Sequence, residues 1–421
     1  MRWLELALHW ALFAVGLVLF ATTLAGLVTS MLIPRPKRAR LALFANHLAR
    51  VALRFFAWRQ ESYEARDAIL AASGPTAVLV QLVVFLLGFW VAFSCMIFGV
   101  SDLGTADSMY QSGATLLTLG IVEPVNTAQV IITFVAAALG LVVIAILIGY
   151  LLTLYAAFTP RESHVNKLSL LAGEPAWGPE LICRDQLLLG GEAASFDVEE
   201  WVDWASDVRM AHTVNPILNH FRSPGPRRSW VISMLAVLDA ANLRLTTVSG
   251  NEMNPAMVRL VTEGTETLAA VQGIQTMIGG AAWVPVRTSR GRLAHGELAA
   301  ATAGQNAVVA AIAADARNSG RHLIQDPTAK YHAEVGITRE EWDHACAVME
   351  RAGVVIFDDR DQAWRDFSAV RITYASNAYA IADSVYAVRA PWSGTRNPDT
   401  DTIWPTLAVD GLSDDAAPAS A

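Results

Sequence analysis

Charged residues are scarce in this chain, and several long stretches lack them altogether. Only 17% of the 421 residues are Asp, Glu, Lys or Arg, whereas 53% belong to the apolar class. Neither residues 76–100 nor residues 127–158 contain a charged side chain. About 20 apolar residues in a helix already cross the roughly 30 Å of bilayer hydrocarbon. The missing charges therefore exclude an ordinary water-soluble chain.

Cysteine and the common cofactor motifs are also missing. The three cysteines, Cys95, Cys183 and Cys346, lie far apart, and none has a second Cys or a His at metal-binding spacing. This excludes a disulfide framework and a zinc site. No GxGxxG follows an expected strand, and there is no phosphate-binding loop or EF-hand. We therefore expect no cofactor, no metal site and no nucleotide-binding regulatory domain.

An excess of acidic residues in the second part of the chain argues against nucleic-acid binding. Residues 159–421 carry 22 basic and 32 acidic side chains. The candidate catalytic side chains there form two groups, which are His332, Glu334 and His344, and Asp358, Asp359 and Asp361. The first spacing is nonspecific and a solvated surface explains the second group, so the sequence favours a protein that is not an enzyme.

Three apolar stretches are long enough to span a membrane. The first runs from Leu4 to Ile33 and exceeds the roughly 7 to 15 apolar residues of a signal peptide, and most positive charges follow it. We interpret residues 1–33 as an extra N-terminal transmembrane helix. The second and third stretches, near 76–100 and 127–158, bound an expected pore domain of residues 76–158.

The distribution of basic residues predicts the orientation of these spans. Residues 34–75 form a linker with eight Lys or Arg and only three Asp or Glu, a bias that keeps a loop in the cytoplasm. The N-terminus and residues 101–126 are then outside, and everything after residue 158 is cytoplasmic. We predict a multi-pass protein of the plasma membrane.

Within this linker, residues 41–58 have the pattern of an amphipathic helix. The apolar set is Leu41, Phe44, Leu48, Val51, Phe55 and Trp58, and the basic set is His47, Arg50 and Arg54. Such a helix can lie in the lipid headgroups, which makes membrane lipid an expected partner. The same pattern fits a helix that packs on the protein itself, and the sequence leaves both interpretations open.

A short polar interruption separates the second and third spans. Asp107 or Ser108 can cap a helix here, and the helix must stop near Gly120. At about 11 residues it is too short to cross the bilayer. Irregular backbone can enter a membrane only where protein or a wet cavity surrounds it. We therefore expect a re-entrant pore helix followed by an irregular return.

The residues after this expected helix are Thr118, Leu119, Gly120, Ile121, Val122 and Glu123. In this position they resemble the Thr-Val-Gly-Tyr-Gly-Asp selectivity filter of the potassium-channel pore family, and the resemblance covers about residues 76–158. It implies a homotetramer in which backbone carbonyls from Thr118 to Val122 bind potassium or other monovalent cations. It also implies that Glu123 stands at the pore mouth.

This stretch departs from the family pattern at two filter positions. Ile121 replaces the tyrosine and Val122 replaces the second glycine. A β-branched residue reaches the conformation of that glycine only at a cost of about 1 to 3 kcal/mol, so we expect an altered outer filter and altered selectivity. In the third span, Gly140 and Gly149 are candidates for the gating hinge of the family, although glycines also serve close helix packing.

Several interpretations remain open at this level. A Thr-Leu-Gly tripeptide alone also fits a tight extracellular turn between two ordinary spans. The leading hypothesis is a potassium-channel-like cation channel subunit that its cytoplasmic domain regulates through a ligand or partner the sequence does not identify. The alternative is a non-conducting membrane sensor or scaffold with a channel-derived membrane domain, in which Val122 blocks ion coordination.

The remainder of the chain predicts a mainly helical cytoplasmic domain over residues 159–393, which makes the whole an all-α membrane protein. The expected helices include Trp230–Arg244, Asn254–Ile278 and Leu298–Ala314. Capping boxes are expected at Asp197 with Glu200 and at Thr338 with Glu341, and a short strand at Val354–Phe357. Residues 394–421 have the composition of a disordered tail.

Overall fold

The structure is a computed structural model that describes residues 2–33, 40–189, 197–249, 254–279, 335–396 and 400–405. Over these ranges the chain forms helices joined by turns, without a β-strand. Its contacts divide it into two units. We call residues 1–59 and 72–157 the apolar unit, and residues 60–71 and 158–421 the polar unit.

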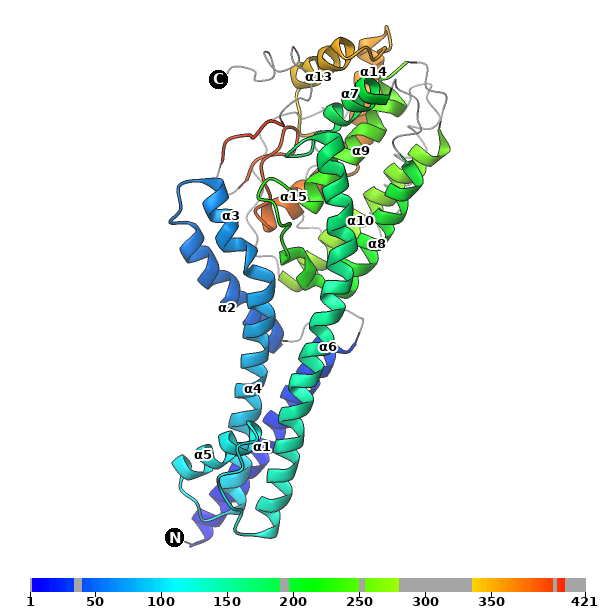
Figure 1. The fold of residues 1–421 in the computed structure, drawn as a ribbon. Coiled ribbons are helices and arrows are strands. Elements are labelled where there is room, and N and C mark those ends of the chain that lie inside the picture. The colour runs from blue at the N-terminus through cyan, green and yellow to red at the C-terminus, as the bar shows by residue number, and fades with distance from the viewer. Residues whose placement is uncertain are drawn as a thin grey trace. The chain divides into compact units, whose positions relative to one another are not determined.

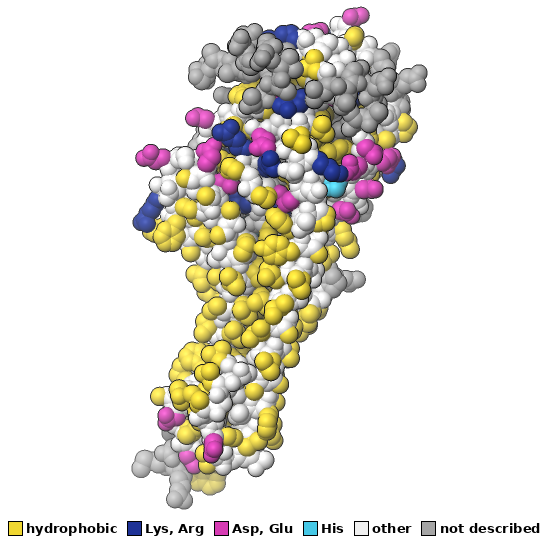
Figure 2. Space-filling view, in the orientation of Figure 1, with side chains coloured by type: hydrophobic (Ala, Val, Ile, Leu, Met, Phe, Trp, Pro, Cys, Tyr) yellow, Lys and Arg dark blue, Asp and Glu magenta, His cyan; other side chains and the backbone are white. Residues whose placement is uncertain are grey.

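The apolar unit is built from long helices. Its elements are α1 (Arg2–Met31), α2 (Arg40–Ala57), α4 (Ser73–Val100), α5 (Thr105–Leu116) and the first part of α6 (Thr127–Ala172) (Figure 1). Three stretches are long and apolar enough to cross a membrane, namely Leu6–Met31, Tyr63–Val100 and Thr127–Ala172. Hydrophobic side chains cover the visible face of these helices in Figure 2. The prediction of a helical chain with three apolar helices is therefore confirmed.

Small residues allow α1 and α4 to pack closely in opposite directions. A Cβ atom on Gly16 would lie 2.7 Å from the carbonyl oxygen of Ala92, and one on Gly99 would lie 2.7 Å from that of His9. Such contacts are typical of helices in lipid, where apolar surroundings provide little drive for association and close backbone approach matters more. The start of α1 therefore lies beside the end of α4.

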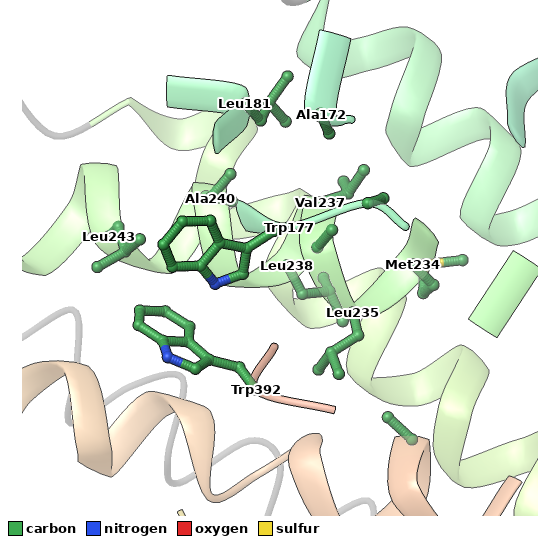
Figure 3. Packing of buried hydrophobic residues seen from close by; sticks show 14 of the residues in the cluster. Ala172, Trp177, Leu181, Met234, Leu235, Val237, Leu238, Ala240, Leu243 and Trp392 are labelled. Carbon is green, nitrogen blue, oxygen red and sulfur yellow. The ribbon is translucent and has the colours of Figure 1, made fainter. Parts of the chain in front are cut away.

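The polar unit is also built from helices. They are α3 (Tyr63–Ala71), the last part of α6, α7 (Gly178–Leu189), α8 (Val198–Val214), the 3₁₀ turn η1 (Pro216–His220), α9 (Trp230–Thr246), α10 (Pro255–Gly279), α13 (Arg339–Arg351), α14 (Arg360–Arg371) and α15 (Ala375–Ser384). Almost every side chain of α9 is buried. Trp177 and Trp392 meet edge to face beside it, with ring centroids 5.8 Å apart (Figure 3). This cluster is the core of the unit.

Local predictions for the polar unit have mixed outcomes. Thr338 and Glu341 form the expected capping box, and Asp197 caps α8 through the backbone N–H groups of Glu199 and Glu200. The strand expected at Val354–Phe357 is wrong, because this segment makes only a single antiparallel bridge, from Ile356 to Val248. The helix expected at Leu298–Ala314, together with His332 and Glu334, lies outside the described residues.

Two boundaries extend further than the sequence predicted. The third span was expected to end at Phe158, but α6 continues through Pro160 to Ala172. The described part of the expected disordered tail packs on the polar unit. Arg396 is buried and donates to the carbonyl oxygen of Ala387 at 3.0 Å, and the ring of Trp404 lies 5.3 Å from that of Trp177. The prediction of disorder does not hold for these residues.

Candidate functional site: the loop between α4 and α6

Helix α5 lies between the two apolar helices that the sequence assigned to a pore, and its ends differ from those expected. Its N-cap is Gly104, which offers no side-chain cap, so the expected cap at Asp107 or Ser108 is wrong. Asp107 falls in the first turn instead, where its charge favours the positive end of the helix dipole. The helix has 12 residues, close to the length that the sequence predicted.

The carboxyl end of α5 is closed by Thr118 and not by Gly120. The Thr118 N–H donates to the carbonyl oxygen of Thr115 at 2.9 Å, and the Leu119 N–H donates to that of Ala114 at 2.7 Å. This pair of bonds is the Schellman arrangement, in which the residue after the cap takes a left-handed conformation that glycine usually supplies. Thr118 takes it with φ of 60°, which is strained for a β-branched side chain.

Hydrogen bonds fasten α5 to the side of α4. The indole Nε1 of Trp90 donates to the carbonyl oxygen of Met109 at 2.9 Å, and the hydroxyl of Ser112 donates to the carbonyl oxygen of Trp90 at 2.9 Å. Trp90 lies ten residues before the end of α4 at Val100, which is about 15 Å along that helix. The middle of α5 is therefore level with the middle of an apolar helix.

Two glutamines join α5 to the start of α6. The side-chain amide of Gln129 donates to Gln111 Oε1 at 3.3 Å, and both side chains are fully buried. Gln129 Oε1 also accepts from the backbone N–H of Val125 at 2.8 Å. Nearby, the Asn126 side-chain amide donates to the carbonyl oxygen of Val100 at 2.8 Å, so the end of α4 and the start of α6 lie together.

The carboxyl end of α5 reaches much further along α6. The carbonyl oxygen of Leu116 would lie only 2.0 Å from a Cβ atom on Gly140, so this contact requires glycine. Gly140 is thirteen residues into α6, or about 20 Å from its start at Thr127. The chain must return over that distance between Leu116 and Thr127. We call residues 117–126 the return segment.

The first half of the return segment is exposed in a single chain, although it is apolar. Leu117, Leu119 and Ile121 expose 58%, 60% and 58% of their surface. Thr118 and Gly120 have φ of 60° and 63°, and Leu119 between them has negative φ.

The remaining predicted site residues divide into packing and exposed positions. Ile121 and Val122 have no positive φ, whereas Thr118 has one, and the altered outer filter expected from Val122 stays a prediction. Glu123 is exposed. Gly140 has a packing contact, whereas Gly149 is exposed, and a Cβ atom added to Gly149 would meet no other atom within 4 Å. The hinge stays a prediction for both glycines.

The charges of the loop between α4 and α6 have one sign. Asp102, Asp107 and Glu123 are all exposed here, and the sequence contains no Lys or Arg between Arg66 and Arg161. Acidic side chains are visible in Figure 2 at the end of the unit that carries the N-terminus. The local field therefore attracts cations and repels anions.

Trp90, Gln111, Ser112 and Gln129 were not identified by the sequence interpretation, although they position α5. Isolated polar side chains inside or beside apolar stretches provide the signal for such residues, because a buried polar group needs a hydrogen-bond partner. Gln129 stands within the first turn of the third apolar stretch, where that signal was present.

A second group of buried charges lies in the polar unit and has a structural role. Arg371 and Asp239 are fully buried and paired, with Nε to Oδ1 at 2.9 Å and Nη2 to Oδ2 at 3.0 Å. Burial raises the pKa of Asp239, and Arg371 opposes that shift. Tyr379 and the carbonyl oxygens of Val335 and Trp392 accept the other guanidinium donors. Every N–H donor of the Arg371 guanidinium is therefore already used, and none is left to bind a substrate.

The described residues contain no group of three or more His, Cys, Asp or Glu side chains that could hold a metal ion. Comparisons with protein-family models, with curated proteins and with solved structures find no match to this chain.

Proposed function

We propose that the chain is one subunit of a tetrameric, potassium-channel-like cation channel, with the return segments of four copies around the conduction path. The observation that carries this proposal is the contact between Leu116 and Gly140. It supports a loop that begins and ends at one end of the apolar helices yet reaches about 20 Å along them. A surface turn has no reason to reach that depth.

The cost of unpaired backbone in lipid supports an assembly. The return segment follows α5 as irregular chain, and such backbone cannot face hydrocarbon. Its exposed Leu117, Leu119 and Ile121 would be covered by neighbouring copies, while its carbonyls would face the axis. Four copies are the number that the resemblance to potassium channels implies.

The helix dipole of α5 supports a cation as the permeant species. The carboxyl end of α5 carries a partial negative charge of about half a unit, and it lies at the deep end of the loop. The outer carboxylates of Asp102, Asp107 and Glu123 add attraction at the entrance. Residues 34–59 are rich in Lys and Arg, a bias that keeps a loop in the cytoplasm. The entrance then faces outward, and the polar unit lies in the cytoplasm.

Flux measurements on the full-length protein test this proposal. Purified protein reconstituted into potassium-loaded liposomes is expected to release potassium down its gradient, read with a proton-coupled dye and a protonophore. Gly120→Ala places a side chain at a positive φ and is expected to reduce the flux. Val125→Ala, at a fully solvated position of the same segment, is the matched control.

The alternative of a non-conducting sensor or scaffold has its own supporting observation. Positive φ values end at Gly120, so Val122 does not take a backbone conformation of the kind that the second filter glycine of the family allows. An intact tetramer, established by cross-linking and light scattering, that conducts no cation at any voltage or pH tried would overturn the channel. Capture of a specific partner by the polar unit would then favour the sensor.

A further inference from the structure

Helix α2 presents two faces of opposite character. The face that packs on α4 and α1 consists of small side chains, since Ala42, Ala45, Ala49 and Ala57 expose at most 8% of their surface. Alanines allow the helix axis to come close to its neighbours. The sequence left open whether this helix lies in the lipid headgroups or packs on the protein, and through this face α2 does pack on the protein.

The large apolar side chains of α2 lie on the other face and are exposed. Phe44, Leu48, Val51 and Phe55 follow each other at intervals of four, three and four residues, which places them in one stripe along a helix. They expose 59%, 48%, 50% and 57% of their surface. A soluble helix would bury such a stripe and expose its small face, and α2 does the reverse.

Basic side chains at the end of α2 and just after it interact with aromatic rings of the same segment. The guanidinium of Arg59 lies 4.0 Å from the ring centre of Phe55, and that of Arg54 lies 5.7 Å from the ring of Trp58. Residues 35–60 contain no Asp or Glu at all. The surface thus combines hydrocarbon with an excess of basic over acidic side chains in its own segment, which is the chemistry of the boundary between acyl chains and anionic headgroups.

We infer that the stripe of α2 lies in the headgroup layer of the membrane and that its arginines bind anionic phospholipid. The small face holds α2 against α4, one of the helices that can cross a membrane, so the stripe points toward whatever surrounds that helix. Leu79, Val83 and Leu87 of α4 are exposed apolar side chains as well. A protein partner would need an acidic, apolar counterface, whereas anionic lipid supplies both properties at this place.

Lipid retention by the full-length protein tests this inference without any measurement of conduction, so it stands or falls separately from the channel proposal. Protein purified in mixed micelles of phosphatidylcholine and phosphatidylglycerol is expected to keep phosphatidylglycerol preferentially, as measured by native mass spectrometry. The double variant Arg54→Gln/Arg59→Gln is expected to reduce that preference on the order of tenfold at low salt. High salt is expected to weaken it in the wild-type protein.

Two further variants separate the contributions of charge and of fold. Phe44→Ser removes apolar contact without changing charge and is expected to lower retention of both lipids. Arg365→Gln removes an exposed arginine of α14 and serves as the matched control. Equal retention of both lipids by wild type, or equal preference in wild type and double variant at an unchanged melting temperature, would overturn the inference. Burial of the stripe against a second copy of the chain in lipid-free detergent would also overturn the inference.

Discussion

Arg222 holds Asp67 in an ion pair inside the polar unit, although 155 residues separate them in the chain. The Nε to Oδ1 distance is 2.6 Å, and both side chains are about nine-tenths buried. The same guanidinium donates to the Tyr63 hydroxyl at 3.0 Å and to the carbonyl oxygen of Tyr386 at 2.9 Å. Because α3 is followed at once by α4, the chain is fixed to the polar unit directly before the second apolar stretch.

The residue before Arg222 makes a corresponding contact with Arg161, in the last third of α6. Arg161 donates to the carbonyl oxygen of Phe221 at 2.7 Å and to that of Leu218 at 3.0 Å. One short turn, residues 216–222, thus binds both the segment that leads into α4 and the segment that follows the third apolar stretch. A change in the polar unit that displaces this turn acts on both segments together.

Breaking the buried pair is expected to destabilise the polar unit. Asp67→Asn or Arg222→Leu leaves one buried charge without its partner, which costs about 3 to 5 kcal/mol. Glu64 and Arg227 join the same helix to the same loop with a 3.3 Å contact, but their side chains are 45% and 47% exposed, so their removal is expected to cost about 0 to 1 kcal/mol. Thermal unfolding in detergent compares the two pairs. An equal fall in melting temperature on breaking either pair would show that burial of the first pair has no energetic consequence.

The stability of the polar unit is expected to fall in mild acid because of His212. Burial, together with the nearby charge of Arg161, lowers the pKa of His212 well below its ordinary value. The unfolded chain therefore takes up a proton near pH 6.5 while the folded protein does not, and the stability present above about 6.5 is lost as the pH falls toward the folded pKa.

A matched variant isolates this contribution. His212→Gln keeps an acceptor for the Arg161 guanidinium, which lies 3.1 Å from His212 Nε2, but cannot be protonated. We expect the melting temperature of this variant to fall less steeply between about pH 7 and 5 than that of the wild type. His47→Gln changes an exposed histidine on α2 and controls for general effects. An identical slope in His212→Gln and wild type would contradict the assignment.

The sequence predicts the long elements of this fold well because their signals are local. Uncharged stretches of more than 20 residues mark α4 and α6, and the Thr338 box marks the start of α13 through contacts within one turn. The helix α5 was expected for the same reason. The start of α5 at Gly104 was not expected, because no side chain caps the helix at that residue.

The positioning contacts of the candidate site depend on tertiary structure and escaped the sequence interpretation. Nothing near Trp90 indicates that its indole meets Met109. Gly140 was a candidate for a hinge or for close helix packing, and its partner Leu116 could not be predicted because the contact joins two segments distant in the sequence. The stop of α5 at Thr118 also contradicts local preference, since glycine is favoured there and Gly120 stood nearby. Tertiary packing overrides propensity at this position.

Relief of the strain at Thr118 is expected to stabilise the protein while changing any current. A non-glycine residue in the left-handed region costs about 1 to 2 kcal/mol, so Thr118→Gly is expected to raise the melting temperature. Leu119→Gly, at the neighbouring residue with negative φ, gains nothing and is the control. If Thr118 lines the conduction path, flux changes in Thr118→Gly despite the higher stability. Unchanged flux would remove Thr118 from the path.

Substitution of the two glycines of α6 distinguishes packing from a hinge. Gly140→Ala places a Cβ atom on the carbonyl oxygen of Leu116, so α5 must shift, and we expect a loss of about 1 to 3 kcal/mol and a lower flux. Gly149→Ala meets no atom and replaces glycine in a helix interior, so we expect a gain of up to about 1 kcal/mol. If Gly149 is the hinge, Gly149→Ala slows opening and lowers open probability in single-channel records while the melting temperature rises. If Gly149→Ala changes neither the rate of opening nor the open probability, and only Gly140→Ala affects flux, then α6 moves without bending at Gly149. The contact between Leu116 and Gly140 is then what sets the position of the return segment.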